Sequence, residues 1–130
     1  MQQELTGKII GAAIEVHKNL GPGLLETVYG ICLGTELENL GLHYQKEVAI
    51  PLLYKNQKIN QFFRIDFVIE NEIILELKSV ETILPIHEAQ ILTYLRLSGK
   101  QVGLLVNFNV PLLKTGIRRY IGATAQLAKA

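Results

Sequence analysis

The sequence predicts an α/β (α+β) domain in which a mixed central sheet is flanked by helices, in the order ααβββαβα. Three observations lead to this fold class. Apolar residues recur every three to four positions in the first 40 residues, which is the period of amphipathic helices. Three strand-like segments with short turns follow, as in an antiparallel meander. A helix and another strand come next, and a crossover of this kind joins parallel strands.

Two helices open the chain. The first is predicted over residues 4–20, where apolar side chains return at every third or fourth position. Gly21-Pro22-Gly23 ends this helix, because glycine and proline interrupt helical structure. The second helix is predicted over residues 24–39, and Gly41 closes it.

The remaining elements are strands at 43–54, 58–70 and 73–80, a helix at 85–98, a strand at 101–107 and a C-terminal helix at 111–126. Turns at residues 55–57 and 70–72 separate the first three strands, so these strands should pair antiparallel. Pro85 is tolerated because it falls in the first turn of its helix. The crossover between residues 73 and 107 implies one parallel pair in the sheet.

Composition limits the class of protein. The chain has 130 residues, 48% of them hydrophobic and 19% charged, which is consistent with one globular domain over residues 1–130. The lone Cys32 excludes an internal disulfide and a multi-cysteine zinc site. With no signal-peptide core and no apolar run of membrane-spanning length, we expect a soluble cytoplasmic protein without a membrane partner. The net charge of +1 gives no basic footprint, so phosphate binding would need locally clustered charge or a metal ion.

The strand at 73–80 carries two charges in an apolar run, Glu76 and Lys78. A three-residue turn at 70–72 would set Asp66 opposite Glu76 and Arg64 opposite Lys78, with Cβ atoms about 4.5–5.5 Å apart. A two-residue turn would put the carboxylates on opposite faces instead. Tight two-residue turns favour Asn-Gly, and no glycine is present, so we expect the three-residue turn.

Paired carboxylates suggest a metal site. Strict alternation along residues 58–70 places Arg64, Asp66 and Val68 on one face. Two carboxylates this close repel unless a cation or a proton lies between them. Mg²⁺ uses one or two carboxylates together with waters and phosphate oxygens, and Lys78 would stand beside it to hold or deprotonate an attacking water. The alternative is a solvent-facing lattice of Asp–Arg and Glu–Lys pairs.

Two helices carry further candidates. Glu26 shares a helical stripe with Tyr29, which places a carboxylate at the head of a core-facing side, although an acid in a first turn also suits the helix dipole. His87, Gln90 and Tyr94 follow i, i+3, i+7 spacing and line one face of the helix at 85–98. That face could equally be the solvated side of an amphipathic helix.

Together these residues form a pattern: Gly23-x-x-Glu26-x-x-Tyr29, then Asp66, then Glu76-x-Lys78, then His87-x-x-Gln90-x-x-x-Tyr94. The pattern resembles the GxxExxY protein family of the PD-(D/E)XK nuclease superfamily, over residues 5 to 120. The resemblance implies a restriction-endonuclease-like core of order α-βββ-α-β, with an extra helix at each end. Ile65 stands where some superfamily members carry proline before the Asp.

The resemblance also implies roles for individual residues. Metal-binding positions match Asp66, Glu76, Glu26 and the backbone carbonyl of Leu77. Lys78 matches the catalytic lysine, and Gln90 with Tyr94 matches the glutamine motif that orients the site or the nucleic acid. His87, Arg64 and Tyr29 are family-typical neighbours without an assigned role.

Other polar residues allow two interpretations. Some related nucleases use a helical histidine as a metal ligand, but His17 fits a hydrogen-bonded structural histidine better. Lys114, Arg118 and Arg119 would form an i, i+4, i+5 basic patch on the helix at 111–126, for phosphate contact or merely as a solvated face. Lys18, Lys46 and Lys58 are scattered along the sequence and support no argument.

Two functions follow as hypotheses. The first is a nuclease that uses Mg²⁺ or Mn²⁺ to hydrolyse phosphodiester bonds in a nucleic acid, with DNA favoured over RNA. The second is a non-catalytic module that keeps the nuclease fold and binds nucleic acid or a protein. The small size and near-neutral charge would suit a homodimer or a protein partner that pools basic surface.

Overall fold

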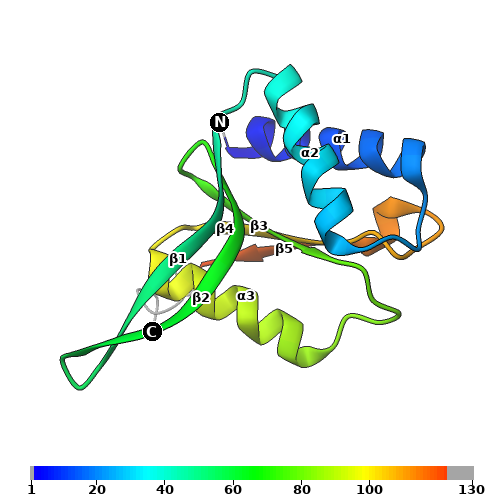
Figure 1. The fold of residues 1–130 in the computed structure, drawn as a ribbon. Coiled ribbons are helices and arrows are strands. Elements are labelled where there is room, and N and C mark those ends of the chain that lie inside the picture. The colour runs from blue at the N-terminus through cyan, green and yellow to red at the C-terminus, as the bar shows by residue number, and fades with distance from the viewer. Residues whose placement is uncertain (1, 123–130) are drawn as a thin grey trace.

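The fold is a sheet with helices on both faces. A computed structural model describes the backbone of residues 2–122 and their side chains apart from those of residues 60–63. Its elements are α1 (Gln2–Leu20), α2 (Glu26–Asn39), β1 (Tyr44–Tyr54), β2 (Gln57–Ile69), β3 (Ile73–Lys78), α3 (Pro85–Ser98), β4 (Val102–Asn107), the short 3₁₀ helix η1 (Leu113–Gly116) and β5 (Ile117–Ile121). Within this part of the chain the strands form one sheet in the order β1-β2-β3-β4-β5. Helices α1 and α2 lie on one face and α3 on the other (Figure 1).

Each face of the sheet buries its own apolar cluster. On β3, Ile73, Leu75 and Leu77 pack into the cluster under α1 and α2, whereas Ile74 packs into the cluster under α3. A strand that is covered on both faces reads as a continuous hydrophobic run. The side chain of Glu76 is only 4% exposed within this strand. Its carboxylate is therefore the exception that needs a local explanation.

The turn between β2 and β3 has the predicted length. Ile69 pairs with Ile73, and the antiparallel ladder continues to Phe67 and Leu75. Glu70 and Asn71 both have positive φ, and the N–H of Glu72 donates to the Ile69 carbonyl at 3.0 Å. This geometry is that of a type I′ turn followed by one extra residue. The predicted register is confirmed over these pairs, but the ladder ends at Phe67 and Leu75, so the predicted pairing of Arg64 with Lys78 is not formed.

The crossover is also confirmed. β3 pairs parallel with β4, so that Lys78 lies beside Asn107 at the ends of the two strands. α3 connects them and ends at Gly99, whose φ of 76° is the left-handed conformation typical of a helix C-cap. In the described part of the chain, no helix combines the length and the apolar character that a membrane crossing requires.

Strict alternation along β2 is wrong at Asp66. Ile65 and Val68 both belong to the cluster under α3, whereas Phe67 belongs to the cluster under α1 and α2. Glu47 on β1 has a φ of 51°, and it lies between the pairs Lys46–Phe67 and Val48–Ile65. A positive φ breaks the pleat, so the hairpin of β1 and β2 changes face at this level. Asp66 therefore lies at a switch point of the sheet.

The predicted C-terminal helix at 111–126 is wrong over the described residues. Residues 113–116 form η1 and residues 117–121 form β5, which pairs antiparallel with β4; residues 123–126 lie outside the described residues. Two glycines allow this path. A Cβ at Gly116 would lie 2.2 Å from the Asn107 carbonyl oxygen, and one at Gly122 would lie 2.6 Å from the Lys100 carbonyl oxygen. The apolar spacing that suggested a helix also fits a short strand rich in isoleucine and tyrosine.

Candidate active site

Asp66 and Glu76 meet where β2 and β3 separate. The last ladder pair between these strands is Phe67 with Leu75. One step further, the N–H of Asp66 donates to Oε2 of Glu76 at 2.7 Å, and the N–H of Leu77 donates to Oδ2 of Asp66 at 2.8 Å. Each carboxylate thus accepts from the backbone of the other strand, in place of a backbone carbonyl. Oδ1 of Asp66 and Oε1 of Glu76 take no part in these two bonds.

Burial makes this pair expensive to ionise. Desolvation, followed by the charge of Asp66, raises the pKa of Glu76 to about 8. Desolvation also raises the pKa of Asp66, although the Leu77 N–H and the charge of Lys78 oppose this shift. Near neutral pH Glu76 therefore largely keeps its proton in the metal-free protein. A divalent cation could take the place of that proton.

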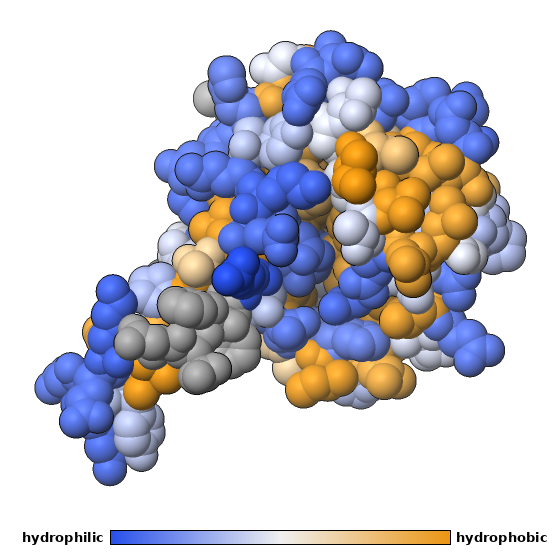
Figure 2. Space-filling view, in the orientation of Figure 1, coloured by the Kyte–Doolittle hydropathy of each residue, from blue (hydrophilic) through white to orange (hydrophobic). Residues whose placement is uncertain are grey.

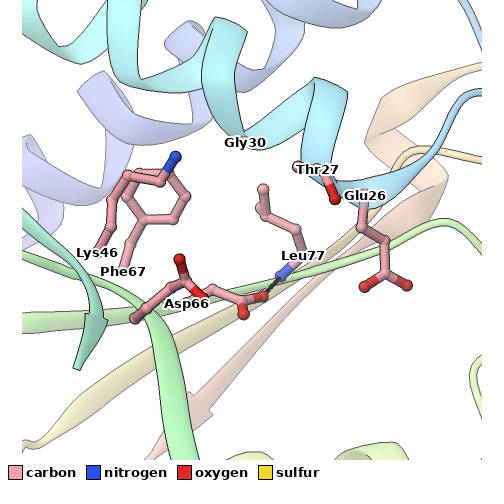
Figure 3. Close-up of a pocket in the computed structure, with 8 residues that line it drawn as sticks. Glu26, Thr27, Gly30, Lys46, Asp66, Phe67 and Leu77 are labelled. Carbon is pink, nitrogen blue, oxygen red and sulfur yellow. Dashed lines mark hydrogen bonds between the residues drawn. The ribbon is translucent and has the colours of Figure 1, made fainter. Parts of the chain in front are cut away.

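A cavity of about 180 Å³ opens beside Asp66, between α2 and the first three strands. Its lining residues are Glu26, Thr27, Gly30, Lys46, Glu47, Asp66, Phe67 and Leu77. Figure 3 shows Asp66 and Glu26 on either side of Leu77. Desolvation is the main cause that raises the pKa of Asp66, and the negative charges of Glu26 and Glu47 add to it, whereas the Leu77 N–H and the charge of Lys78 oppose it.

Glu26 lines the cavity without joining the carboxylate pair. It is the first residue of α2, and its Oε2 accepts from the N–H of Ser79 at 3.3 Å. Among the described residues, no three His, Cys, Asp or Glu side chains come close enough together to hold one metal ion. The described residues therefore contain no preformed group of three such ligands, and metal binding by Asp66, Glu76 and Glu26 stays a prediction.

Tyr29 braces the loop that leads into α2. Its hydroxyl donates to the Gly21 carbonyl at 2.6 Å and accepts from the N–H of Leu24 at 3.1 Å. Its ring is fully buried and stacks on Phe108, with centroids 4.3 Å apart and an interplanar angle of 7°. These two hydrogen bonds to the Tyr29 hydroxyl hold the Gly21–Gly23 loop in place. Tyr29 sets where α2 begins and hence where Glu26 lies.

Lys78 ends β3 and is half-buried. Its positive charge lowers the pKa of both Asp66 and Glu76, which places it within electrostatic reach of the pair. Asn107 fixes the chain after it, because its Nδ2 donates to the Val80 carbonyl at 2.9 Å and its Oδ1 accepts from the Val80 N–H at 3.1 Å. Sequence reasoning missed Asn107, although a polar residue that closes an apolar strand was a visible signal.

The three candidates on α3 do not share one role. Tyr94 is buried, and desolvation followed by the charges of Glu76 and Asp66 raises its pKa to about 12. Gln90 is half-buried one turn earlier on the same helix face. His87 caps the helix instead, since its Nδ1 accepts from the N–H of Leu84 at 3.0 Å. Tyr94 therefore lies within electrostatic reach of the carboxylate pair, His87 holds the start of α3, and a role for Gln90 stays a prediction.

His17 and Arg64 lie away from the pair. Nε2 of His17 donates to the Val110 carbonyl at 2.8 Å, and its ring lies 6.4 Å from that of Phe108. This contact supports the structural interpretation of His17. Arg64 is exposed on β2, where it pairs with Ala49; the ladder between β2 and β3 ends before it could reach Lys78.

The predicted basic patch of Lys114, Arg118 and Arg119 does not exist as a helical surface. Lys114 lies on η1, and the two arginines are neighbours on β5, where successive side chains point to opposite faces. Nη1 of Arg118 also donates to Glu88 at 2.9 Å, in an exposed ion pair that links β5 to α3. The helical spacing on which the patch depended is absent from this strand.

Sequence reasoning missed Lys46 and Glu47 as cavity residues. Lys46 extends across the ring of Phe67, with Nζ 5.4 Å from the ring centroid (Figure 3). Glu47 reaches the cavity because of its positive φ. The regular alternation of a strand does not predict either residue at the cavity, because β1 changes face at Glu47.

Comparison with known proteins assigns the family. Residues 3–120 match the family model described as the PD-(D/E)XK nuclease superfamily. No match was found among curated proteins or solved structures. The matched range includes the carboxylate pair, Lys78, the cavity and Gln90 with Tyr94. Because the model covers nearly the whole chain, this protein belongs to the PD-(D/E)XK nuclease superfamily.

Proposed function

We propose that this protein is a metal-dependent nuclease that hydrolyses phosphodiester bonds in DNA or RNA, with Mg²⁺ or Mn²⁺ as cofactor. Within the superfamily we assign it to the GxxExxY family, on the Gly23-x-x-Glu26-x-x-Tyr29 motif. One observation carries the proposal: Asp66, which is half-buried, and Glu76, which is buried, are held together by reciprocal hydrogen bonds to the backbone of the other strand. Two adjacent acids at such a position are costly to ionise unless a cation lies beside them.

The donor set fits a hard divalent cation. Mg²⁺ is usually bound through one or two carboxylates and keeps several waters, and Asp66 and Glu76 supply two carboxylates. The backbone carbonyl of Leu77 would be a further oxygen ligand. When bound, the ion would neutralise charge on a phosphate group and lower the pKa of a water molecule.

The surrounding residues would position the substrate and the water. Lys78, within electrostatic reach of both carboxylates, would orient the attacking water and stabilise developing negative charge. Gln90 and Tyr94 would hold a phosphate oxygen or Lys78 from the α3 side. Glu26, from the α2 wall, would assist metal binding, either directly or through a metal-coordinated water.

Incubation with Mn²⁺ or Mg²⁺ and a panel of linear, circular, branched and single-stranded substrates tests the proposal. We expect cleavage by the wild type, and a loss of at least 100-fold in Lys78→Ala and Asp66→Asn. Lys18→Ala removes an exposed lysine from α1. It is the matched control for Lys78→Ala, because it loses the same charge and is purified in the same way, and it should cleave as the wild type does.

Two results would change the conclusion. Equal cleavage by wild type and Lys78→Ala would mean that the activity arises elsewhere or from a contaminant. Metal-independent binding of nucleic acid without any cleavage would favour the non-catalytic binding module.

A further inference from the structure

The hairpin of β1 and β2 extends beyond the body of the protein. We define the arm as residues 48–64, from the level of Asp66 to the turn at Lys55 and Asn56. In Figure 1 it projects at the lower left, away from α1 and α2, and Figure 2 shows a hydrophilic tip on the same projection. Such an extension is not needed to complete the sheet around the cavity.

One face of the arm packs on α3, and the other is exposed. Val48 and Ile50 contact the cluster under α3. Between them and beyond them, Ala49, Pro51 and Leu53 are exposed. The pairing of β1 with β2 shifts between Ile50, which pairs with Phe63, and Leu52, which pairs with Ile59, so the extra residues lie on β2 and not on β1. Side chains alternate along a strand, so the three exposed residues of β1 mark the face that points away from α3.

Register places two cations on that exposed face. Arg64 pairs with Ala49, and Lys58 pairs with Leu53. Cross-strand partners point to the same side of a sheet, so Arg64 and Lys58 lie on the face that points away from α3. The exposure of both side chains agrees with this placement.

Lys46 joins the same face to the cavity. The change of face at Glu47 puts Lys46 on the α2 side of the sheet, where it lines the cavity together with Asp66. The exposed face of the arm continues that side outward. We call Lys46, Lys58 and Arg64 the basic arm face.

Charge on the arm is one-sided. Residues 48–64 contain Lys55, Lys58 and Arg64 and no acidic residue, whereas the whole chain has a net charge of only +1. The remainder of the chain is therefore net negative. Within the described residues, the ion pair between Arg118 and Glu88 does not involve the arm, and no acidic side chain pairs with the basic arm face.

A second copy of the chain is a poor occupant for the arm. β1 is an edge strand, and pairing of two such edges would need a continuous row of backbone N–H groups. Pro51 lies in the middle of β1 and has no N–H to donate. A row of like charges would also repel its own copy. A polyanion has the complementary charge.

We propose that the basic arm face binds the phosphodiester backbone of a polynucleotide and leads it to the cavity beside Asp66. This inference rests on the proposed function and specifies its substrate as a long nucleic acid. The seven-residue step from Lys46 to Leu53, the partner of Lys58, covers about 23 Å at about 3.3 Å per residue. At about 3.4 Å per nucleotide of a strand, this corresponds to about six or seven base pairs.

Binding without cleavage provides the test. The affinity for a fluorescein-labelled 20-base-pair DNA duplex is measured by anisotropy in EDTA, over a series of salt concentrations. We expect the double variant Lys58→Gln/Arg64→Gln to bind at least 5-fold more weakly at low salt. The slope of log K against log salt should become shallower by about 2, because two phosphate contacts are lost.

Matched variants separate the arm from net charge. Lys8→Gln/Lys18→Gln removes two exposed lysines from α1 and should bind as the wild type does. Lys58→Arg/Arg64→Lys keeps both charges and should retain the wild-type slope. Equal weakening by the α1 and arm variants, or no weakening by the arm variant, would overturn the inference. A loss on DNA and RNA duplexes alike would support backbone contact, and a loss that depends on base sequence would contradict it.

A small phosphodiester separates this inference from the proposed function. Bis(p-nitrophenyl) phosphate is too short to reach the arm, so the arm variant should hydrolyse it at the wild-type rate with Mn²⁺. One outcome is that neither the wild type nor any variant hydrolyses this compound or a nucleic acid, while duplex binding still depends on the arm. The proposed nuclease function is then wrong, and nucleic-acid binding by the arm is supported. If hydrolysis occurs and the arm variant binds the duplex as tightly as the wild type does, only the inference about the arm is wrong.

Discussion

Asp66 and Glu76 orient each other through backbone hydrogen bonds that replace one step of the sheet ladder. The N–H of Asp66 donates to Glu76, and the N–H of Leu77 donates to Asp66. Neither carboxylate can turn without leaving a buried N–H unpaired, which costs about 1–3 kcal/mol. The two groups are therefore held in a fixed mutual arrangement by β2 and β3, and the sheet supplies the preorganisation that a metal site requires.

Glu76→Gln should stabilise the metal-free protein at alkaline pH. Burial and the charge of Asp66 raise the pKa of Glu76 from its ordinary 4.5 to about 8 in the folded protein. The folded state therefore binds the Glu76 proton more tightly than the unfolded state does. The stability that this proton contributes is fully present below about pH 4.5 and is lost as the pH rises through 8. Glutamine keeps an acceptor for the Asp66 N–H and has no charge to bury. Urea unfolding in EDTA should show a gain on the order of 2 kcal/mol at pH 8.5 and little change at pH 5.

Glu72→Gln is the matched control, because Glu72 is exposed in the adjoining turn. It should change stability by no more than about 0.5 kcal/mol at either pH. A Glu76→Gln variant that is less stable than wild type at pH 8.5 would show that Glu76 is ionised and well compensated without a metal.

Divalent cations should bind with release of a proton. Burial and the charge of Asp66 raise the pKa of Glu76 to about 8, so at pH 7 a cation must displace the proton on Glu76. Affinity for Mn²⁺ should rise about 10-fold per pH unit from pH 6 to 8 and level off above that. Titration calorimetry in two buffers of different ionisation enthalpy measures about one proton released at pH 7. A binding enthalpy that is independent of the buffer would contradict a protonated Glu76 in the metal-free protein.

Tyr29→Phe should weaken both the fold and the site. The substitution keeps the stack on Phe108 and removes the hydroxyl that joins Gly21 to Leu24, at a cost of about 1–3 kcal/mol. Because this loop sets where Glu26 lies, cleavage per folded molecule should fall as well. Tyr44→Phe is the matched control: its hydroxyl donates to Glu38 at an exposed position, and its loss should cost under 1 kcal/mol. Similar effects of the two substitutions would contradict a positioning role for Tyr29.

The sequence was sufficient for the parts of the fold that follow regular periods. The register of Asp66 against Glu76 depended on one turn, and the absence of glycine there led to the observed three-residue length. The parallel pair of β3 and β4 followed from the crossover helix. Both are local rules applied to short segments, so neither needed knowledge of distant contacts.

Features that depend on tertiary contact could not be read in the same way. The positive φ of Glu47 turns the hairpin over and brings Lys46 to the cavity, yet no periodic signal marks it. The direction of Asp66 depends on a donor, the Leu77 N–H, that exists only once the strands separate. The path of residues 113–121 depends on close approaches of Gly116 to Asn107 and of Gly122 to Lys100, which no helical or strand period reveals.

Gly116→Ala distinguishes the observed C-terminal strand from the helix that the spacing had suggested. In a helix interior, replacement of glycine by alanine would stabilise the protein by up to about 1 kcal/mol. In the structure the new Cβ would lie 2.2 Å from the Asn107 carbonyl oxygen, which is backbone and cannot move aside cheaply. We therefore expect a loss of about 2–3 kcal/mol in the free energy of unfolding, measured in urea. Gly7→Ala on the exposed side of α1, where a Cβ meets nothing within 4 Å, should instead raise stability slightly.

Gly116→Ala should also affect cleavage. Asn107 holds Val80 by two hydrogen bonds, so displacement of the Asn107 backbone should move the chain next to Lys78, and cleavage should fall by more than the loss of stability explains. If both glycine variants are stabilised to the same extent, β5 is not formed as described.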